Sequence, residues 1–555
     1  MLALIGTHSL SSGELSSRMK KVNRVSDIEH ALEGARGSFS VVGSCRGTGY
    51  ARGSASGARR IYHTSIDGAT IGADRARTLA WLKSAEIDRE QLAARIAFPV
   101  LPHPVAGRSM WTGVHSLPVE ESLTVERDGS HRTATWWQAP PAELTLAEGS
   151  ALLRDELRAA VSARLRPGEL LGVDLSGMDS TSLCYLAAES GARLVTSTVR
   201  WSAPGNEDHA YALTTHERLK NADTLLFESG DLPGFFTGMG IRHEPSDEPF
   251  ALQWDRASSG RISHAIRSLG ASMRLSGHGG DHVVQPPVSY LRHVLRENPW
   301  TALRHVSGWR AHNRWSLKAT GHLLLDRRPY STWLAEAGGR LRERDALDET
   351  PEPWGYRPQL PPWASDVSVE LLRGLLRTAS HEVEPLAPVA WRHAWIKHVQ
   401  EAGAVAKLLA HTSDDEGLRI ESPYCDDGVV NACLSVRPDQ ARAPWSYKPL
   451  LAAAMRGIVP ETHLRRESKD HCGQEWFAGL RSHQRDLASW VDTSLLVEMG
   501  IVDRENMRRA MLNPYLLSGG AAQLNNTLGA EEWLRDLSAF PTPRYMESSH
   551  KEVGS

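Results

Sequence analysis

The pattern of apolar and polar positions changes near residue 140. Before it, short strand-like runs such as 38–42 and 69–72 lie among turns rich in Gly, Ser and Arg, and one helical period covers 78–94. Segment 138–142 reads Gln-Ala-Pro-Pro-Ala, which is typical of a linker. We therefore predict a separate amino-terminal domain over residues 1–140.

Beyond the linker, apolar runs of strand length alternate with segments of helical period. The predicted strands are 170–175, 193–199, 223–228 and 271–276, and the predicted helices between them are 181–189, 207–219 and 256–269. This alternation predicts an α/β fold with a parallel sheet, whose ligand lies at the carboxyl ends of the strands. The stretch 290–410 is helical and rich in Trp, and we expect residues 541–555 to be a disordered tail.

Composition narrows the class of protein. The 555 residues are too many for one hydrophobic core and indicate two or three domains. A net charge of −3 argues against a nucleic-acid partner. No apolar run is long enough to span a membrane, and Met1–Ile5 lacks the features of a signal peptide, so we expect a cytoplasmic protein with no membrane partner. The five cysteines show no C-x-x-C spacing, which indicates neither a disulfide framework nor a zinc site.

The predicted strand 170–175 stops at Ser176-Gly177 and passes directly into a helix. Gly177 lets the backbone approach an anion, Ser176 and Ser180 offer hydroxyls, and the first amides of the helix point at the same place. These features indicate a phosphate site. The carboxylate of Asp179 would repel phosphates unless a divalent cation lay between them, so the arrangement implies Mg²⁺ and a nucleotide. The alternative is a Ser/Asp helix cap after a buried strand.

The residues Ser-Gly-Met-Asp-Ser at 176–180 resemble the S-G-G-x-D-S loop of the N-type ATP pyrophosphatases, which include the asparagine synthetase family. One glycine is missing or shifted, and no Walker motif surrounds the loop. The resemblance implies that ATP and Mg²⁺ are bound, that ATP is split between its α and β phosphates, and that AMP is transferred to a carboxylate. It also implies a site for pyrophosphate, formed by Ser176, Gly177, Met178 and Ser180. The adenosine would be flanked by Leu175, Val199, Ser276 and Gly277.

A second Gly-rich turn follows the predicted strand 271–276. The residues Ser-Gly-His-Gly-Gly-Asp at 276–281 are similar to the family's S-G-x-G-x-D motif, and Asp281 adds a carboxylate at the same sheet edge as Asp179. Two carboxylates can share one Mg²⁺. The resemblance therefore implies that Asp179 and Asp281 are the metal ligands.

His278 stands where asparagine synthetases carry Glu and β-lactam synthetases carry a Tyr that helps to deprotonate the attacking amine. An imidazole with an unperturbed pKa of about 6.5 suits a general base near neutral pH. His278 is therefore a candidate catalytic residue, and the alternative is that it contacts only ligand or neighbouring backbone. His282 replaces the acid that the family carries after Asp281.

Two downstream segments are also similar to the family. Glu421–Asp427 resembles R-V-P-F-L-D-H, and Trp445–Leu451 together with Gly457–Pro460 resembles K-x-x-L-R…L-P. In this match Lys448 is the catalytic cation that stabilises charge on the tetrahedral intermediate and the departing phosphate. The alternative for Lys448 is a structural role, because an arbitrary Lys is usually exposed and structural. Lys is scarce in this chain, however, with only ten residues against 53 Arg. Lys469 echoes the family's R-x-K with one extra residue.

The amino-terminal block resembles a glutaminase-like α+β domain through Gly34–Phe39 and Trp136-Trp137. Its family nucleophile, a cysteine at the amino terminus, is missing here because position 2 is Leu2 and the first cysteine is Cys45. We therefore expect that the attacking amine comes from the substrate itself or from a second substrate, and not from glutamine.

Within the family, residues 148–540 look most like the lasso peptide cyclases, because of His278 in the second motif and the Trp- and Arg-rich helical stretch. This resemblance implies a macrolactam synthetase. An Asp or Glu side-chain carboxylate of the leader-free core peptide is adenylated and joined to the peptide's α-amine, with release of AMP and pyrophosphate. The implied partners are the precursor core peptide, a leader-recognition protein and a leader peptidase.

Alternatives remain at two levels. The Trp-rich stretch 290–410 suits a groove for an unfolded peptide, but Trp at helical spacing is also typical of plain core. The whole chain is also consistent with a β-lactam-synthetase-like or asparagine-synthetase-like enzyme that adenylates a small-molecule carboxylate, or with a catalytically inactive scaffold.

Overall fold

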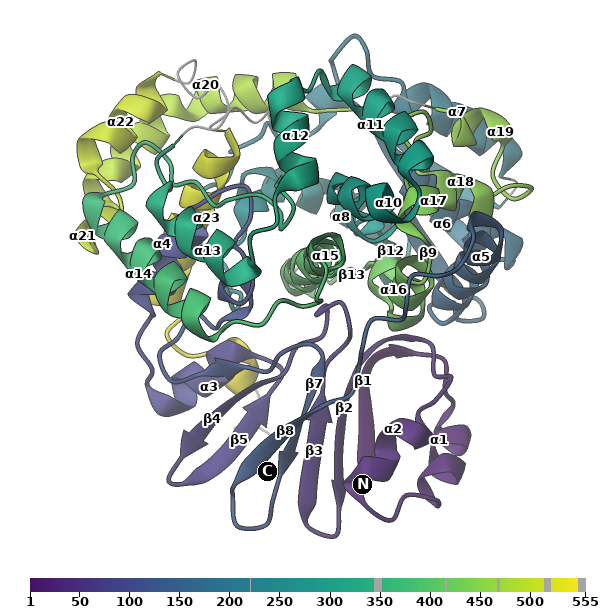
Figure 1. The fold of residues 1–555 in the computed structure, drawn as a ribbon, viewed down its shortest axis with the longest axis horizontal. Helices are drawn as coiled ribbons and strands as arrows, with labels where there is room; N and C mark the ends of the chain where they lie inside the picture. The colour runs from purple at the N-terminus through teal and green to yellow at the C-terminus, as the bar shows by residue number, and fades with distance from the viewer. Residues whose placement is uncertain (220, 344–351, 415–416, 467–469, 514–520, 548–555) are drawn as a thin grey trace.

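The computed structural model describes residues 1–219, 221–343, 352–414, 417–466, 470–513 and 521–547. In Figure 1 an amino-terminal domain built on strands lies below a larger, mainly helical domain. The chain passes from one to the other between β8 (His131–Thr135) and α5 (Leu146–Ser162). The change of pattern near residue 140 coincides with this passage.

The amino-terminal domain contains two antiparallel sheets, of order β1-β2-β3-β7-β8 and β5-β4-β6. The predicted runs 38–42 and 69–72 lie in β2 and β5. The predicted helical period 78–94 falls into two helices, because Ser84 takes a left-handed backbone (φ 52°) that ends α3. The elements are β1 (Leu2–His8), α1 (Ser12–Met19), α2 (Ile28–Ala31), β2 (Gly37–Cys45), β3 (Thr48–Arg52), β4 (Tyr62–Ile66), β5 (Ala69–Ala73), α3 (Ala76–Lys83), α4 (Arg89–Arg95), β6 (His115–Ser116), β7 (Glu121–Val125) and β8.

The larger domain contains one parallel sheet, of order β11-β10-β9-β12-β13. Its strands are β9 (Leu170–Asp174), β10 (Arg193–Arg200), β11 (Ala222–Glu228), β12 (Met273–Leu275) and β13 (Arg419–Glu421). The four predicted strands are confirmed, and the helices between them are α6 (Met178–Glu189), α7 (Asp208–Arg218) and α8 (Arg256–Ser268). The pattern does not predict β13, because three residues are too few to show a period.

Helices cover both faces of this sheet. Leu194 and Val195 follow each other in β10, so their side chains point to opposite faces. Leu194 packs in a buried cluster with Leu157 of α5 and Leu183 of α6, whereas Val195 packs in another cluster with Ile266 of α8. The α/β fold class is therefore confirmed, with a parallel sheet whose carboxyl edge is the expected place for a ligand.

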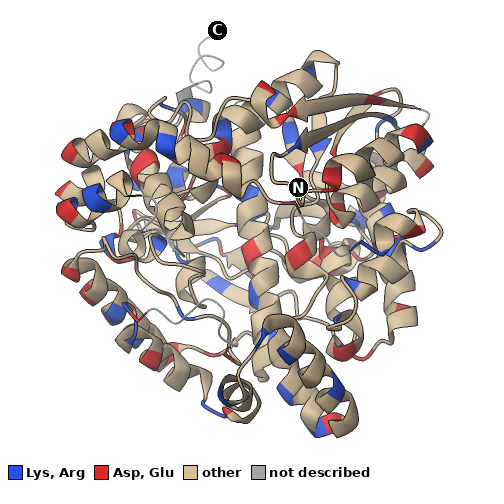
Figure 2. Cartoon of the chain, turned by 90° about the horizontal axis from the view of Figure 1, so that it is seen from above, with Lys and Arg blue, Asp and Glu red and all other residues tan. Residues whose placement is uncertain are grey.

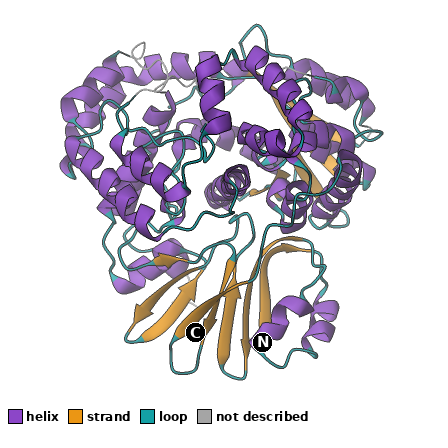
Figure 3. Ribbon diagram, viewed as in Figure 1, coloured by secondary structure: helices purple, strands orange, loops and turns teal. Residues whose placement is uncertain are grey.

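A helical extension follows β12. Its longest helix, α15 (Ala390–Asp414), is seen end-on at the centre of Figures 1 and 3, between α13 and α16. The remaining helices are α9 (Gly280–Val283), α10 (Leu291–Glu297), α11 (Pro299–Asn313), α12 (Leu317–Leu325), α13 (Tyr330–Gly339), α14 (Asp366–Glu382), α16 (Asp427–Leu434), α17 (Pro438–Ala441), α18 (Pro449–Ala454), α19 (Glu461–Leu464), α20 (Gly473–Trp490), α21 (Leu495–Glu498), α22 (Arg504–Leu512), α23 (Ala521–Ala539) and α24 (Arg544–Glu547).

The Trp residues of the stretch 290–410 act mainly as core. Trp333, Trp363 and Trp395 are each at most 1% exposed, whereas Trp300 is 82% exposed. Of the two alternatives for this stretch, the structure therefore favours core packing over a peptide groove.

Residues 541–555, which we expected to be a disordered tail, begin with ordered structure. Residues 544–547 form α24, and Tyr545 attaches it: Thr78 donates a hydrogen bond to the Tyr545 hydroxyl, and the Arg75 guanidinium lies 5.7 Å from its ring centre. Residues 548–555 lie outside the described residues.

Charges of both signs are spread over the molecule. In Figure 2 the segments coloured for Lys and Arg are interspersed with those for Asp and Glu, in line with the net charge of −3. Within the described ranges, every helix is too short or too polar to cross a membrane.

Candidate active site

The first loop connects β9 to α6 at the carboxyl edge of the sheet. The Ser176 N–H donates to the hydroxyl oxygen of Ser180 (3.1 Å), and this hydroxyl donates to the carbonyl of Gly177 (3.2 Å), so the loop closes on itself. The helix begins before the predicted residue 181, because the Gly177 carbonyl already accepts a bond from the N–H of Thr181 (3.1 Å). The first turn of α6 thus presents backbone N–H groups at this edge, as an anion site requires.

The second loop follows β12, which is hydrogen-bonded beside β9. A Cβ on Gly277 would lie 2.7 Å from the backbone nitrogen of Ser180, and one on Gly280 would collide with the carboxylate of Asp179. Glycines at these two positions let the loops touch. They bring Asp281, at the start of α9, to the same edge as Asp179.

Lys448 connects the two acids. Its ammonium forms ion pairs with the carboxylates of Asp179 and Asp281, the latter at 2.7 Å, and the side chain is 1% exposed. Burial alone lowers the pKa of this ammonium, but the two carboxylates outweigh burial and raise the pKa above its ordinary value. The backbone at Lys448 is left-handed (φ 45°), which is a strained conformation for a residue other than glycine. The fold therefore holds a buried positive charge beside the two carboxylates at the ends of β9 and β12.

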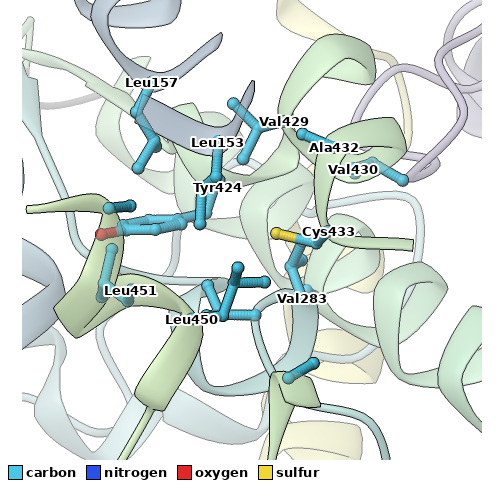
Figure 4. Packing of buried hydrophobic residues seen from close by; sticks show 14 of the residues in the cluster. Leu153, Leu157, Val283, Tyr424, Val429, Val430, Ala432, Cys433, Leu450 and Leu451 are labelled. Carbon is cyan, nitrogen blue, oxygen red and sulfur yellow. The ribbon is translucent and has the colours of Figure 1, made fainter. Parts of the chain in front are cut away.

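The turn after β13 supports the first loop. Tyr424 is buried in the apolar cluster that includes Leu153 and Leu450, as Figure 4 shows. Its hydroxyl donates a hydrogen bond of 3.1 Å to the backbone carbonyl of Asp179. The segment Glu421–Asp427 thus contributes a buried tyrosine that fixes the position of the metal-ligand candidate Asp179.

His278 is held by α15. Its Nε2 donates a hydrogen bond to the carbonyl oxygen of Ala402 (2.9 Å), so Nε2 carries the proton and Nδ1 keeps a lone pair. Burial is the main cause that lowers the pKa of His278 to about 4, below the unperturbed value assumed from the sequence. His278 is therefore neutral at pH 7 and able to accept a proton, but it is a weaker base than a free imidazole.

A cavity of about 380 Å³ brings these groups together. The predicted residues that line it are Ser176, Gly177, Met178, Asp179, Ser180, Ser276, Gly277, His278 and Asp281. Leu175 and Val199, which we expected beside the adenosine, do not line it, because each packs into an apolar cluster against the sheet. Lys448 does not line the cavity itself but contacts two residues that do, Asp179 and Asp281. Lys469 lies outside the described residues.

Comparison of the sequence with protein families shows to which family the chain belongs. The family model described as asparagine synthase matches residues 152–535, well over half of the chain. The chain belongs to the asparagine synthase family. Members of this family are ATP-dependent, AMP-forming amide ligases. A search of curated proteins gives no match.

Two solved structures are similar over part of the chain. One is glutamine phosphoribosylpyrophosphate amidotransferase from B. subtilis in complex with ADP and GMP, at 12% identity over 52% of this chain and 62% of that one, with a TM-score of 0.18. The other is the allosteric regulatory enzyme of purine biosynthesis, at 13% identity over 50% of this chain and 68% of that one, with a TM-score of 0.17. The chain thus spans less than two thirds of the first structure.

The residues of this asparagine synthase family member fit ATP and Mg²⁺. A Cβ on Gly177 would meet no atom within 4 Å, so this glycine leaves open space beside the first amides of α6, where a phosphate fits. Asp179 and Asp281 supply hard oxygen donors, and Mg²⁺ is commonly held by one or two carboxylates together with substrate phosphates. Among the described residues no group of three or more His, Cys, Asp and Glu is arranged to hold a metal, and a Mg²⁺ ion here would be held by these two carboxylates together with phosphates and water.

Arg466 and Trp201 are two of the lining residues to which the sequence analysis gives no role. Arg466, 4% exposed, donates to the carbonyl of Ser176 (3.1 Å) and pairs with the carboxylate of Asp208, which places a positive charge beside the phosphate loop. Trp201 directly follows β10 at the same sheet edge. The rule that finds Asp281 at the end of a strand applies to Trp201 as well. Arg466 follows no strand, but it is the Arg of the segment that echoes the family's R-x-K, from which the sequence analysis considered only Lys469.

Replacement of His278 by alanine is expected to slow amide formation by about 10²–10⁴-fold and to spare adenylation, because only amide formation removes a proton from the amine. Exchange of labelled pyrophosphate into ATP measures the first step and product formation the second. Because its pKa is lowered to about 4, His278 gains a proton only at acid pH and its titration does not slow the wild-type enzyme down to about pH 5. Near-normal amide formation by the variant would assign the proton transfer to another group.

Proposed function

We propose that the chain is a macrolactam synthetase of the lasso peptide type. It adenylates an Asp or Glu side-chain carboxylate of a leader-free core peptide and joins it to the peptide's α-amine. The observation that carries the amide-synthetase part is the buried Lys448, which pairs with Asp179 and Asp281, two carboxylates that line the same cavity as His278. A leader-recognition protein and a leader peptidase are the proposed partners.

The chemistry proceeds in two balanced steps. A carboxylate oxygen attacks the α-phosphorus of ATP, and the bond from this phosphorus to the oxygen that bridges to the β-phosphorus breaks. Pyrophosphate leaves, and an acyl adenylate remains. The amine nitrogen then attacks the acyl carbon, and AMP departs with the electron pair of the broken C–O bond. In this proposal the amine's proton goes to Nδ1 of His278, and Lys448 stabilises the negative charge on the intermediate and on the departing phosphate. Bound Mg²⁺ would neutralise phosphate charge between Asp179 and Asp281.

The thiols of the chain favour an amine that the substrate brings with it. Burial raises the pKa of Cys184 and Cys425 to about 12 and that of Cys472 to about 11, and burial also raises the pKa of Cys433. Cys45, at the end of β2, donates its S–H to the carbonyl of Asn23 (3.2 Å). None of these five described thiols has the activated setting that glutamine hydrolysis needs.

A peptide substrate is supported by one exposed aromatic residue near the cavity. Trp445 is 49% exposed, and the guanidinium of Arg304 lies 4.3 Å from its ring centre. Trp445 is two residues before Tyr447, which lines the cavity. A stacked aromatic and Arg pair at this place suits a chain that extends beyond the reacting carboxylate.

Incubation with ATP, Mg²⁺ and hydroxylamine is expected to release pyrophosphate only when a core peptide is present. Hydroxylamine captures the acyl adenylate, so the acceptor carboxylate can be located by mass spectrometry of the hydroxamate. Release with small acids but not with peptides would replace the proposal by a small-molecule synthetase. The absence of release with any acid, in protein that binds ATP, would support an inactive scaffold.

A further inference from the structure

Residues 53–60, within the loop that connects β3 to β4, contact the turn that carries Tyr424. The backbone N–H of Ala55 donates to Oδ1 of Asp427 (2.8 Å), and the hydroxyl of Ser56 donates to the carbonyl of Cys425 (2.7 Å). Ala55 and Ser56 are both 0% exposed. The amino-terminal domain therefore makes buried hydrogen bonds to the synthetase domain at the turn after β13.

Charged side chains tie the same two segments together. The Arg52 guanidinium lies 3.7 Å from the carboxylate of Asp427, and the Arg59 guanidinium lies 3.6 Å from that of Glu421. On the other side, Arg164 donates two bonds of 2.7 Å to Asp426 and further bonds to Glu421. The amino-terminal domain and Arg164 thus each hold both ends of the turn 422–427, at Glu421 before it and at Asp426 or Asp427 at its end.

α15 follows the same loop closely. A Cβ on Gly403 would overlap the backbone of Ser56, so the helix and the loop touch backbone to backbone. The neighbouring residue Ala402 accepts the hydrogen bond from His278. The loop therefore also borders the helix that orients the candidate base.

The turn contacts both loops that carry the metal-ligand candidates. Tyr424 donates to the carbonyl of Asp179, and a Cβ on Gly279 would lie 3.2 Å from Cβ of Tyr424 and 3.1 Å from Sγ of Cys425. One turn thus touches the loop that carries Asp179 and the loop that carries Asp281. A displacement of the turn would move both carboxylates.

We propose that the loop 53–60 of the amino-terminal domain is a positioning element of the ATP site. It acts through the turn 422–427 and Tyr424 on the loop that carries Asp179. The amino-terminal domain then serves the synthetase reaction by shaping the nucleotide site. The inference rests on the proposed function only in that ATP is the ligand of the cavity.

Replacement of Ser56 by alanine tests this inference. Ser56→Ala removes the hydrogen bond to the Cys425 carbonyl and also the hydroxyl that accepts from the N–H of Ala58 inside the loop (3.3 Å). It is expected to weaken binding of ATP with Mg²⁺ by about fivefold, the amount that the lost hydrogen bond to the turn is worth when its effect reaches the site in full. Pyrophosphate exchange should slow by about tenfold to a hundredfold, because small displacements of reacting groups are costly. Isothermal titration calorimetry with ATP and Mg²⁺ measures binding without any turnover.

A matched control separates positioning from stability. Ser122→Ala removes a similar bond, from the Ser122 hydroxyl to the carbonyl of Ala134 (3.0 Å), inside the amino-terminal sheet. We expect Ser122→Ala to keep wild-type ATP affinity even where its thermal stability falls as much as that of Ser56→Ala. Equal ATP affinity in the two variants would overturn the inference.

The combination with Tyr424→Phe tests the path. If Ser56 and Tyr424 act through the same turn, the double variant should bind ATP about as weakly as whichever single variant has the lower ATP affinity, because the effects of coupled sites do not add. Fully multiplicative losses would show that the loop acts by another route and would contradict the inference. Wild-type protein that binds ATP but forms no amide would overturn the proposed function and leave this test intact.

Discussion

Replacement of Lys448 by methionine is expected to lower the rate of amide formation by about 10²–10³-fold, the effect of removing one preorganised group that stabilises developing negative charge. Methionine keeps an apolar stem of similar length but carries no charge. The ammonium is buried and paired with Asp179 and Asp281, so no water replaces it easily when it is lost. Release of AMP in the presence of ATP, Mg²⁺ and peptide measures the effect.

A second buried lysine provides the control. Lys407 of α15 is 4% exposed and pairs with Asp247 at 2.6 Å, away from the cavity lining. Lys407→Met should lower the melting temperature, because it leaves a buried carboxylate with less compensation, but the protein that stays folded should keep its specific activity. A folded Lys448→Met protein with near-normal AMP release would remove Lys448 from the mechanism.

The sequence predicts the sheet and its two loops because both depend on local signals. Apolar runs that end at Ser176-Gly177 and at Ser276-Gly277 identify β9 and β12, and the carboxyl ends of neighbouring parallel strands meet at one edge. This is why Asp179 and Asp281 come together as predicted.

Other features of the site depend on packing that no local pattern encodes. The pKa of His278 is set by its burial against α15, a helix more than a hundred residues away in the sequence. Leu175 has the right distance from the loop to flank a ligand, but its side chain is 1% exposed and packs in the core. Arg466 reaches the Ser176 carbonyl from a segment without any strand beside it. Each of these facts follows from tertiary contacts, so the sequence alone does not predict it.

Replacement of either metal-ligand candidate by asparagine is expected to remove adenylate formation, with a loss of about 10³-fold or more, because the phosphates would lose a ligand of their cation as well as a fixed charge. The two variants should differ in stability. The Asp179 side chain is 14% exposed and lies against Gly280, whereas that of Asp281 is 39% exposed. Asp179→Asn should therefore also lower the melting temperature, whereas Asp281→Asn should fold normally and isolate the chemical effect.

The dependence on Mg²⁺ distinguishes a metal ligand from a residue that only holds Lys448. In a calorimetric titration the wild-type protein should bind ATP more tightly as Mg²⁺ is raised, and Asp281→Asn should lose most of this dependence. Asp247→Asn is the matched control, because Asp247 is a buried acid paired with Lys407 that does not line the cavity; it should lose stability but keep the Mg²⁺ dependence. Normal pyrophosphate release by Asp281→Asn, or an unchanged response of its ATP affinity to Mg²⁺, would leave Asp281 as a partner of Lys448 alone.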